Sequence, residues 1–218
     1  MYRYVLFDLD GTLTDSGEGI RNCVRYALEK SGITETDRKK LDRFVGPPLL
    51  DSFERWYGMD ETKAMQAVVY YRERYAPTGI FENRVYDGIQ ELLSSLRAEG
   101  RMLIVASSKP EEYVRIVLQR FDLAQYFSVI VGATMDERSA DKPQILREVL
   151  RRAKVREQDR RSMVMIGDRR YDIEGARSIG IDSIGAGYGY AEPGELQSAG
   201  ADYTVMSVRE LQELFRTI

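Results

Sequence analysis

The stretch Tyr2-Arg-Tyr-Val-Leu-Phe-Asp8-Leu-Asp10-Gly11-Thr-Leu-Thr-Asp15 decides the fold. Residues 2–9 are apolar and β-prone, which predicts a buried strand. Side chains two residues apart lie on one face of a strand, so Asp8 and Asp10 would be presented together where the chain turns at Gly11. Close carboxylates disfavour joint ionisation, so the pair predicts a hard metal ion, a shared proton, or both. A hairpin turn is the alternative, but no second strand of alternating pattern follows.

Composition excludes several classes of protein. The 218 residues carry 32 basic and 35 acidic side chains, a formal charge of -3 that offers no general attraction to a nucleic acid polymer or a membrane. No stretch approaches the roughly 18 apolar residues of a membrane span, and Asp8 and Asp10 lie where a signal peptide would be apolar, so we expect a cytoplasmic protein. The absence of histidine excludes Ser-His-Asp and Cys-His catalysis and histidine-ligated zinc. The single cysteine, Cys23, lies in a helical pattern and is predicted to be a core residue.

The chain changes its pattern twice. Residues 18–76 show helical periodicity and almost no strand pattern, which predicts an all-helical insert. From residue 84 onward, continuous apolar strands alternate with helices, which is typical of a parallel sheet covered on both faces. Such a sheet has its active crevice at the carboxyl ends of the strands. The predicted strands are 101–106, 127–131, 162–166, 181–184 and 203–205, and the predicted helices are 87–99, 111–120, 143–153 and 208–215.

Polar side chains follow the predicted strand ends. Ser107 and Ser108 come after the strand 101–106, Lys142 precedes the helix at 143, and Asp168 and Asp172 follow the strand 162–166. Each has a simpler interpretation: the serines and aspartates would be helix caps, and the lysine a solvated side chain. Their occurrence in order at successive strand ends favours a shared site.

These residues resemble a known family. Asp8-Leu-Asp-Gly-Thr12, Ser107, Lys142 and Gly167-Asp-Arg-Arg-Tyr-Asp172 are similar to the four motifs of the haloacid dehalogenase superfamily. The resemblance spans nearly the whole chain. It implies an α/β fold, with a Rossmann-like parallel sheet core formed by residues 1–15 and 80–218 and an inserted all-helical cap domain formed by residues 16–79.

The resemblance also implies a mechanism for the site. Asp8 would attack the phosphorus atom, and Asp10 would serve as general acid and then general base. Asp8, Asp168 and the backbone carbonyl of Asp10 would hold Mg²⁺, and Asp172 would orient these ligands or the metal-bound waters. Ser107, Ser108 and Lys142 would bind the phosphoryl oxygens. Retention of Asp10 favours oxygen leaving groups over halides.

Substrate contacts are expected from the cap. Gly46 and Pro47, with Pro48, are candidates, although a Gly-Pro-Pro segment is also typical of a bend between helices. Several aromatic side chains would line the pocket or pack in the cap core: Tyr26, Trp56, Tyr57, Tyr70 and Tyr71.

The expected function is hydrolysis of a small phosphorylated metabolite. Residues 12–16, 45–49 and 85–88 resemble phosphoglycolate phosphatases and related proteins named 5′-nucleotidases, with the former favoured. A pyrophosphatase, a phosphosugar mutase and a non-catalytic protein that binds a phosphorylated ligand remain alternatives. A receiver domain is too short, and a dinucleotide-binding fold would need a Gly-x-Gly-x-x-Gly motif after the first strand. A monomer and a homodimer both remain open.

Overall fold

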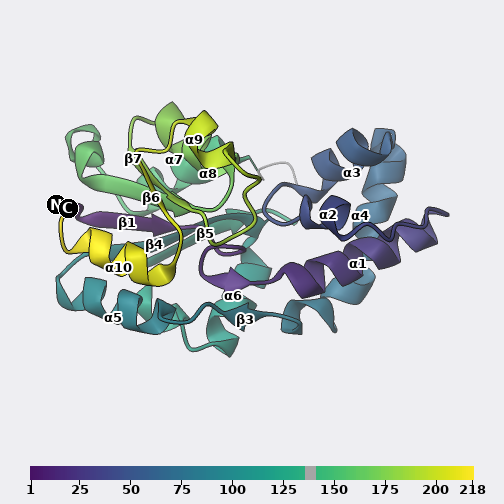
Figure 1. The fold of residues 1–218 in the computed structure, drawn as a ribbon, viewed down its shortest axis with the longest axis horizontal. Coiled ribbons are helices and arrows are strands. Elements are labelled where there is room, and N and C mark those ends of the chain that lie inside the picture. The colour runs from purple at the N-terminus through teal and green to yellow at the C-terminus, as the bar shows by residue number, and fades with distance from the viewer. Residues whose placement is uncertain (136–140) are drawn as a thin grey trace.

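A twisted parallel sheet forms the larger part of the protein (Figure 1). The computed structural model describes residues 1–135 and 141–218. The sheet has six strands in the order β5-β4-β1-β6-β7-β8, all parallel, which confirms the predicted fold class. Their bounds are β1 Tyr4–Phe7, β4 Met102–Pro110, β5 Val129–Ala133, β6 Met163–Gly167, β7 Asp182–Ala186 and β8 Tyr203–Val205.

Helices cover both faces of the sheet because successive strand side chains point to opposite sides. In β1, Val5 and Phe7 join the core that α5, α6 and α10 cover, whereas Tyr4 and Leu6 join the core beneath α7 and α8. Figure 1 shows these two helical layers below and above the strands. The helices are α5 Ile89–Ala98, α6 Glu111–Arg120, α7 Lys142–Arg152, α8 Arg170–Ser178, α9 Glu195–Ala199 and α10 Val208–Phe215.

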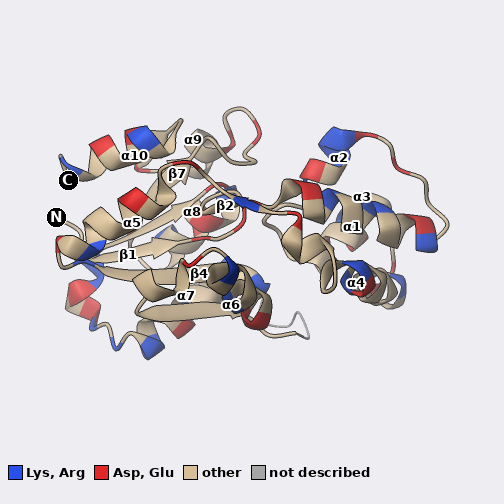
Figure 2. Cartoon of the chain, turned by 90° about the horizontal axis from the view of Figure 1, so that it is seen from below, with Lys and Arg blue, Asp and Glu red and all other residues tan. Residues whose placement is uncertain are grey.

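Four helices form a separate layer beyond the end of the sheet, and we call them the cap (Figures 1 and 2). They are α1 Gly17–Lys30, α2 Arg38–Asp42, α3 Leu49–Tyr57 and α4 Glu61–Tyr75. Cys23 is buried on α1, as predicted, and α1 packs along α4. Both chain termini lie at the opposite end of the molecule, so the strands run toward the cap.

The structure differs from the sequence-based expectations at several places, and two of these differences bear on the site. The chain crosses between sheet and cap through a short antiparallel pair, β2 (Thr14–Asp15) and β3 (Arg84–Val85), which the sequence did not predict. Two residues per strand are too few to show an alternating pattern. In addition, β4 continues to Pro110 through a register shift after Ala106, so the strand is longer than predicted. Among the described residues, no helix has the length and apolarity that crossing a membrane would require.

Candidate active site

The carboxyl ends of three neighbouring strands bring the predicted residues together. β1 lies between β4 and β6 in the sheet. Asp8 and Asp10 follow β1, Ser107 and Ser108 lie in the last part of β4, and Asp168 follows β6. Because β1 is the central strand of this group, its two carboxylates face groups from both neighbours.

A cluster of three carboxylates occupies this edge. Oxygens of Asp8, Asp168 and Asp172 lie within 4.8 Å of one another, and all three side chains are buried. Burial, assisted by the neighbouring carboxylates, raises the pKa of Asp8 to about 6, although Lys142 opposes the shift. The same causes raise the pKa of Asp168 well above its usual range. The Oδ1 atom of Asp168 has no hydrogen-bond partner among the described residues. Oxygen ligands crowded in this way fit a hard divalent cation such as Mg²⁺.

Lys142 lies at the centre of this charge. Its Nζ is 2.9 Å from Asp8 Oδ1 and 2.7 Å from Asp172 Oδ1, and it donates to the carbonyl oxygen of Ala106 at 2.9 Å. Burial opposes its positive charge, but the carboxylates of Asp172 and Asp8 outweigh this and raise its pKa. The alternative of a solvated lysine is therefore wrong. The edge of the sheet therefore holds a buried ammonium between two buried carboxylates.

A second buried ion pair joins Asp10 to Lys109. Lys109 Nζ donates to Asp10 Oδ2 at 2.5 Å, and both side chains are buried. Burial opposes the charge of Lys109, but Asp10 outweighs it, so the pKa of Lys109 is raised. The sequence does not indicate a role for Lys109, because one lysine after a serine pair carries no specific signal. Asp10 is not one of the three clustered carboxylates, and it lines the pocket described below.

The backbone around Asp168 fixes its orientation. Gly11 has a φ of +79°, and a Cβ at this position would overlap the Asp168 carboxylate. On the other side, the backbone N–H of Tyr190 donates to Asp168 Oδ2 at 2.7 Å. The Tyr190 hydroxyl also bonds Asp15 in β2, where the chain enters the cap. Sequence reasoning missed Tyr190, which lies in the loop after β7.

The sequence left open that some polar residues at the strand ends only cap helices, and the structure gives different outcomes for them. Asp172 does cap α8, because its Oδ2 accepts the backbone N–H of Arg169 at 3.1 Å, while its Oδ1 faces Lys142. Asp172 therefore caps α8 and contacts Lys142 at the same time, and its role in orienting metal ligands stays a prediction. The serines do not cap α6, which begins at Glu111 after Pro110 without a side-chain cap. The Ser107 hydroxyl instead accepts the backbone N–H of Lys109 at 3.3 Å.

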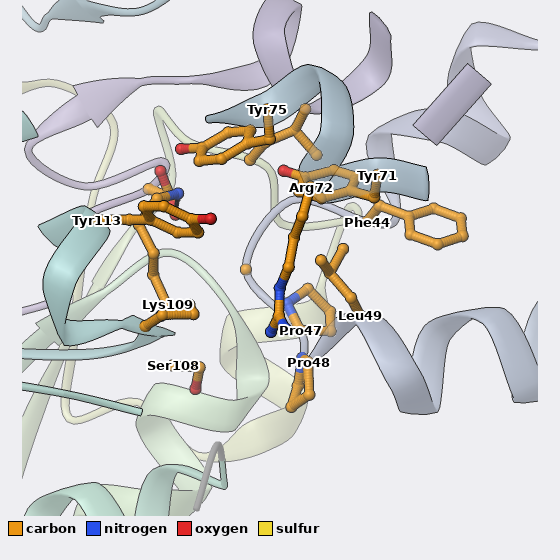
Figure 3. A pocket seen from close by; sticks show the side chains of 14 residues that line it. Phe44, Pro47, Pro48, Leu49, Tyr71, Arg72, Tyr75, Ser108, Lys109 and Tyr113 are labelled. Atoms are coloured by element: carbon orange, nitrogen blue, oxygen red, sulfur yellow. Dashed lines mark hydrogen bonds and ion pairs between the residues drawn. The ribbon is translucent and has the colours of Figure 1, made fainter. Parts of the chain in front are cut away.

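A pocket with a cavity volume of about 50 Å³, which opens to solvent, lies between the sheet and the cap (Figure 3). Asp10, Ser108 and Lys109 line it from the sheet. The cap contributes the two predicted residues, Gly46 and Pro47, together with Ile20, Phe44, Pro48, Leu49, Tyr71, Arg72 and Tyr75. Pro110 and Tyr113 complete the wall.

Only one of the five aromatic candidates from the sequence lines this pocket. That residue is Tyr71, on α4. Tyr57 and Tyr70 border a separate hollow on the cap, and Trp56 borders hollows beside α3. Helical periodicity shows which side chains share a face, but it does not show which of them reach the sheet.

Arg169 joins the cap to the sheet beside this pocket. Its Nη1 donates to the carbonyl oxygen of Val45 at 2.6 Å, and its Nε donates to Glu195 at 3.0 Å. The Arg169 side chain also passes under Gly46, whose φ is +101°. The turn that carries the predicted cap residues is therefore held against the sheet by a buried side chain.

Comparisons with known proteins identify the family to which the chain is similar. A family model described as haloacid dehalogenase-like hydrolase matches residues 5–186. A 5′-nucleotidase of Pseudomonas aeruginosa is 43% identical over 197 residues, which cover 90% of this chain and 88% of that protein. A phosphoglycolate phosphatase of Chromobacterium violaceum is 31% identical over 97% of this chain and 96% of its own length. The crystal structure of a predicted phosphatase from Clostridium acetobutylicum covers 100% of both chains with a TM-score of 0.95 and 45% identity.

Proposed function

The chain belongs to the haloacid dehalogenase-like hydrolases, and from this premise we propose that it is a Mg²⁺-dependent phosphomonoesterase that works through an aspartyl-phosphate. The observation that carries the proposal is the buried cluster of Asp8, Asp168 and Asp172 beside Lys142. Three acids within 4.8 Å and one ammonium form a site for a cation and a phosphoryl group together. The family resemblance seen in the sequence is confirmed, whereas the roles of the individual residues are part of the proposal.

Asp8 would be the nucleophile. One of its carboxylate oxygens would form a bond to phosphorus while the bond from phosphorus to the ester oxygen breaks. Lys142, at 2.9 Å, holds the Asp8 side chain in place and favours its charged form. Asp10 would give its proton to the departing oxygen, and it would later take a proton from the water that releases phosphate from Asp8. Asp10 lines the pocket, which is where a leaving group would lie.

Mg²⁺ would supply positive charge that lets an anionic phosphoryl group approach an anionic nucleophile. Asp8, Asp168 and the backbone carbonyl of Asp10 would hold it, with Asp172 orienting these groups. Two observations support this assignment. The Oδ1 atom of Asp168 lacks a hydrogen-bond partner among the described residues, and burial beside like charges raises the pKa of Asp168.

The non-bridging phosphoryl oxygens would be bound by Lys142, Ser107 and Ser108. Lys142 offers a buried positive charge, and the two serines offer hydroxyl groups at the end of β4. Donors that are fixed before the reaction stabilise charge as it develops in the transition state. The cap, which lies beyond this end of the sheet, would exclude water from this step.

The preferred substrate class is a nucleoside 5′-monophosphate. The 43% identical relative is a 5′-nucleotidase, and three aromatic side chains, Tyr71, Tyr75 and Tyr113, are among the residues that line the pocket. Phosphoglycolate, which the sequence favoured, is the second candidate. Lys109 and Arg72 also line the pocket, and they would pair with its carboxylate.

Hydrolysis of phenyl phosphate with and without Mg²⁺ tests the proposal. We expect phosphate release that requires the metal and is abolished in Asp8→Asn. Adenosine 5′-monophosphate and phosphoglycolate, measured next, would rank the substrate classes by kcat/KM. If none of these compounds is hydrolysed but each raises the melting temperature, the protein is a phospholigand-binding protein and the proposal is wrong.

A further inference from the structure

The hydroxyl group of Tyr75 is a buried polar group without a partner. Tyr75 is the last residue of α4 and is 1% exposed. Its hydroxyl oxygen has no hydrogen-bond partner among the described residues. Burial raises the pKa of this phenol, so the group is a neutral donor. A buried hydroxyl that bonds nothing is unfavourable, and such groups in folded proteins call for a specific explanation.

The ring of Tyr75 is held firmly by its neighbours. Tyr71 stacks on it at 5.1 Å between ring centres, and Tyr113 meets it edge-on at 5.3 Å. Lys109 Nζ lies 5.0 Å from the ring centre. Figure 3 shows the hydroxyl directed toward the end of the Lys109 side chain, at the margin of the pocket. The ring is therefore fixed without help from the hydroxyl, which leaves that group available to a bound molecule.

The region that the hydroxyl faces belongs to the leaving-group side of the site. Lys109 Nζ bonds Oδ2 of Asp10, while Oδ1 of Asp10 has no partner among the described residues. In the proposed function, Asp10 gives its proton to the ester oxygen of the substrate as the leaving group departs. Atoms next to that ester oxygen would consequently lie beside Lys109 and the Tyr75 hydroxyl.

We infer that Tyr75 is a specificity-determining residue whose hydroxyl donates a hydrogen bond to an oxygen atom of the leaving group, close to the ester oxygen. The inference rests on the proposed function for the location of the leaving group. The ribose of a nucleoside 5′-monophosphate and the carboxylate of phosphoglycolate both carry such an oxygen. Phenyl phosphate carries none, because its leaving group is a hydrocarbon ring beyond the ester oxygen.

The substitution Tyr75→Phe removes this hydroxyl and keeps the ring. Tyr70→Phe is the matched control, because Tyr70 lies on the same helix but borders a different hollow, with Lys30 Nζ 5.5 Å from its ring. We expect Tyr75→Phe to lower kcat/KM about 10-fold for adenosine 5′-monophosphate or for phosphoglycolate, whichever is the better substrate, and to change it less than about 2-fold for phenyl phosphate. The substrate whose kcat/KM falls more is the one that carries the oxygen to which the Tyr75 hydroxyl donates. Tyr70→Phe should leave all three values unchanged.

Thermal unfolding of the free protein separates substrate binding from a structural role. Since the hydroxyl has no hydrogen-bond partner among the described residues and the neighbouring Lys109 ammonium is already paired with Asp10, Tyr75→Phe should melt no lower than the wild type. An equal loss of kcat/KM on all three substrates, or a lower melting temperature with no change in substrate preference, would overturn the inference. An unchanged preference with unchanged stability would overturn it as well.

Binding measurements decide the question even without catalysis. Calorimetry would compare Asp8→Asn with the double variant Asp8→Asn/Tyr75→Phe, using adenosine 5′-monophosphate and phosphoglycolate as probes. The inference predicts about 10-fold weaker binding of one probe in the double variant. The inference is refuted if each probe has the same dissociation constant in Asp8→Asn and in the double variant. If the wild type hydrolyses nothing and the binding difference is still found, the proposed function fails but the role of Tyr75 in ligand recognition stands.

Discussion

The substitution Asp8→Asn should stabilise the metal-free protein at neutral pH while it abolishes activity. Burial and nearby carboxylates raise the pKa of Asp8 from 3.8 to about 6. Between these two values the folded state binds more protons at this position than the unfolded state, so stability falls as the pH rises. Above about pH 6 the folded protein must hold a charge that it disfavours. Asparagine carries no charge and removes this penalty.

The size of the effect follows from the shift. A difference of about two pKa units corresponds to about 3 kcal/mol, of which about 2 kcal/mol develops between pH 4.5 and pH 7.5. The free energy of unfolding of Asp8→Asn, measured relative to the wild type, should therefore rise by about 2 kcal/mol across this range. Saturating Mg²⁺ should remove most of this difference at pH 7.5, because a ligand at 100 times its Kd stabilises the folded state by about 2.7 kcal/mol.

Urea unfolding in the presence of a chelator, at both pH values, measures these quantities. Asp51→Asn, at an exposed position on α3, is the control and should show no such trend. If Asp8→Asn is destabilised to the same extent at pH 7.5 as at pH 4.5, the carboxylate is not under electrostatic strain, and the reasoning for a metal site at Asp8 fails.

Three further predictions concern the same edge of the sheet. Lys142→Met should lower kcat at least about 100-fold and destabilise the fold by about 3 kcal/mol, because two buried carboxylates lose their ammonium partner; steady-state kinetics and urea unfolding measure both. Gly11→Ala should weaken Mg²⁺ binding, measured by calorimetry, since its Cβ would displace the Asp168 carboxylate; unchanged affinity would contradict this packing. Removal of divalent metal with a chelator should stop phenyl phosphate hydrolysis, and added Mg²⁺ should restore it; activity that persists without metal would exclude the assigned role of Asp168.

The sequence predicted the sheet and the residues at its edge because both follow from local patterns. Continuous apolar strands between helices have few alternatives to a parallel sheet. Once β1 is central, Asp8 and the residues after β4 and β6 must meet. The sequence could not predict that Lys109 turns toward Asp10, because the register shift after Ala106 determines where that side chain points.

The cap was harder to predict for a related reason. A helical stripe identifies Tyr71 and Tyr75 as buried, but burial inside the cap and burial against the sheet look the same in sequence. Their contacts depend on the angle at which α4 reaches the sheet, and β2 and β3 hold the chain where it crosses between the two parts. Such two-residue strands leave no periodic signal, so the part of the site that selects substrate is the part least visible in the sequence.

Unsatisfied groups link the two halves of this site. In the carboxylate cluster, Asp168 Oδ1 lacks a partner among the described residues, and so do Asp10 Oδ1 and the Tyr75 hydroxyl on the leaving-group side. Folding alone does not select for such groups, since each would be more stable if bonded or replaced by an apolar side chain. A cation at Asp168 and a substrate oxygen at Tyr75 would each remove a penalty that the free protein carries. Part of the binding free energy at this edge would then come from removing these penalties. For this reason, substitutions such as Asp8→Asn and Tyr75→Phe should lower activity without lowering the stability of the free protein.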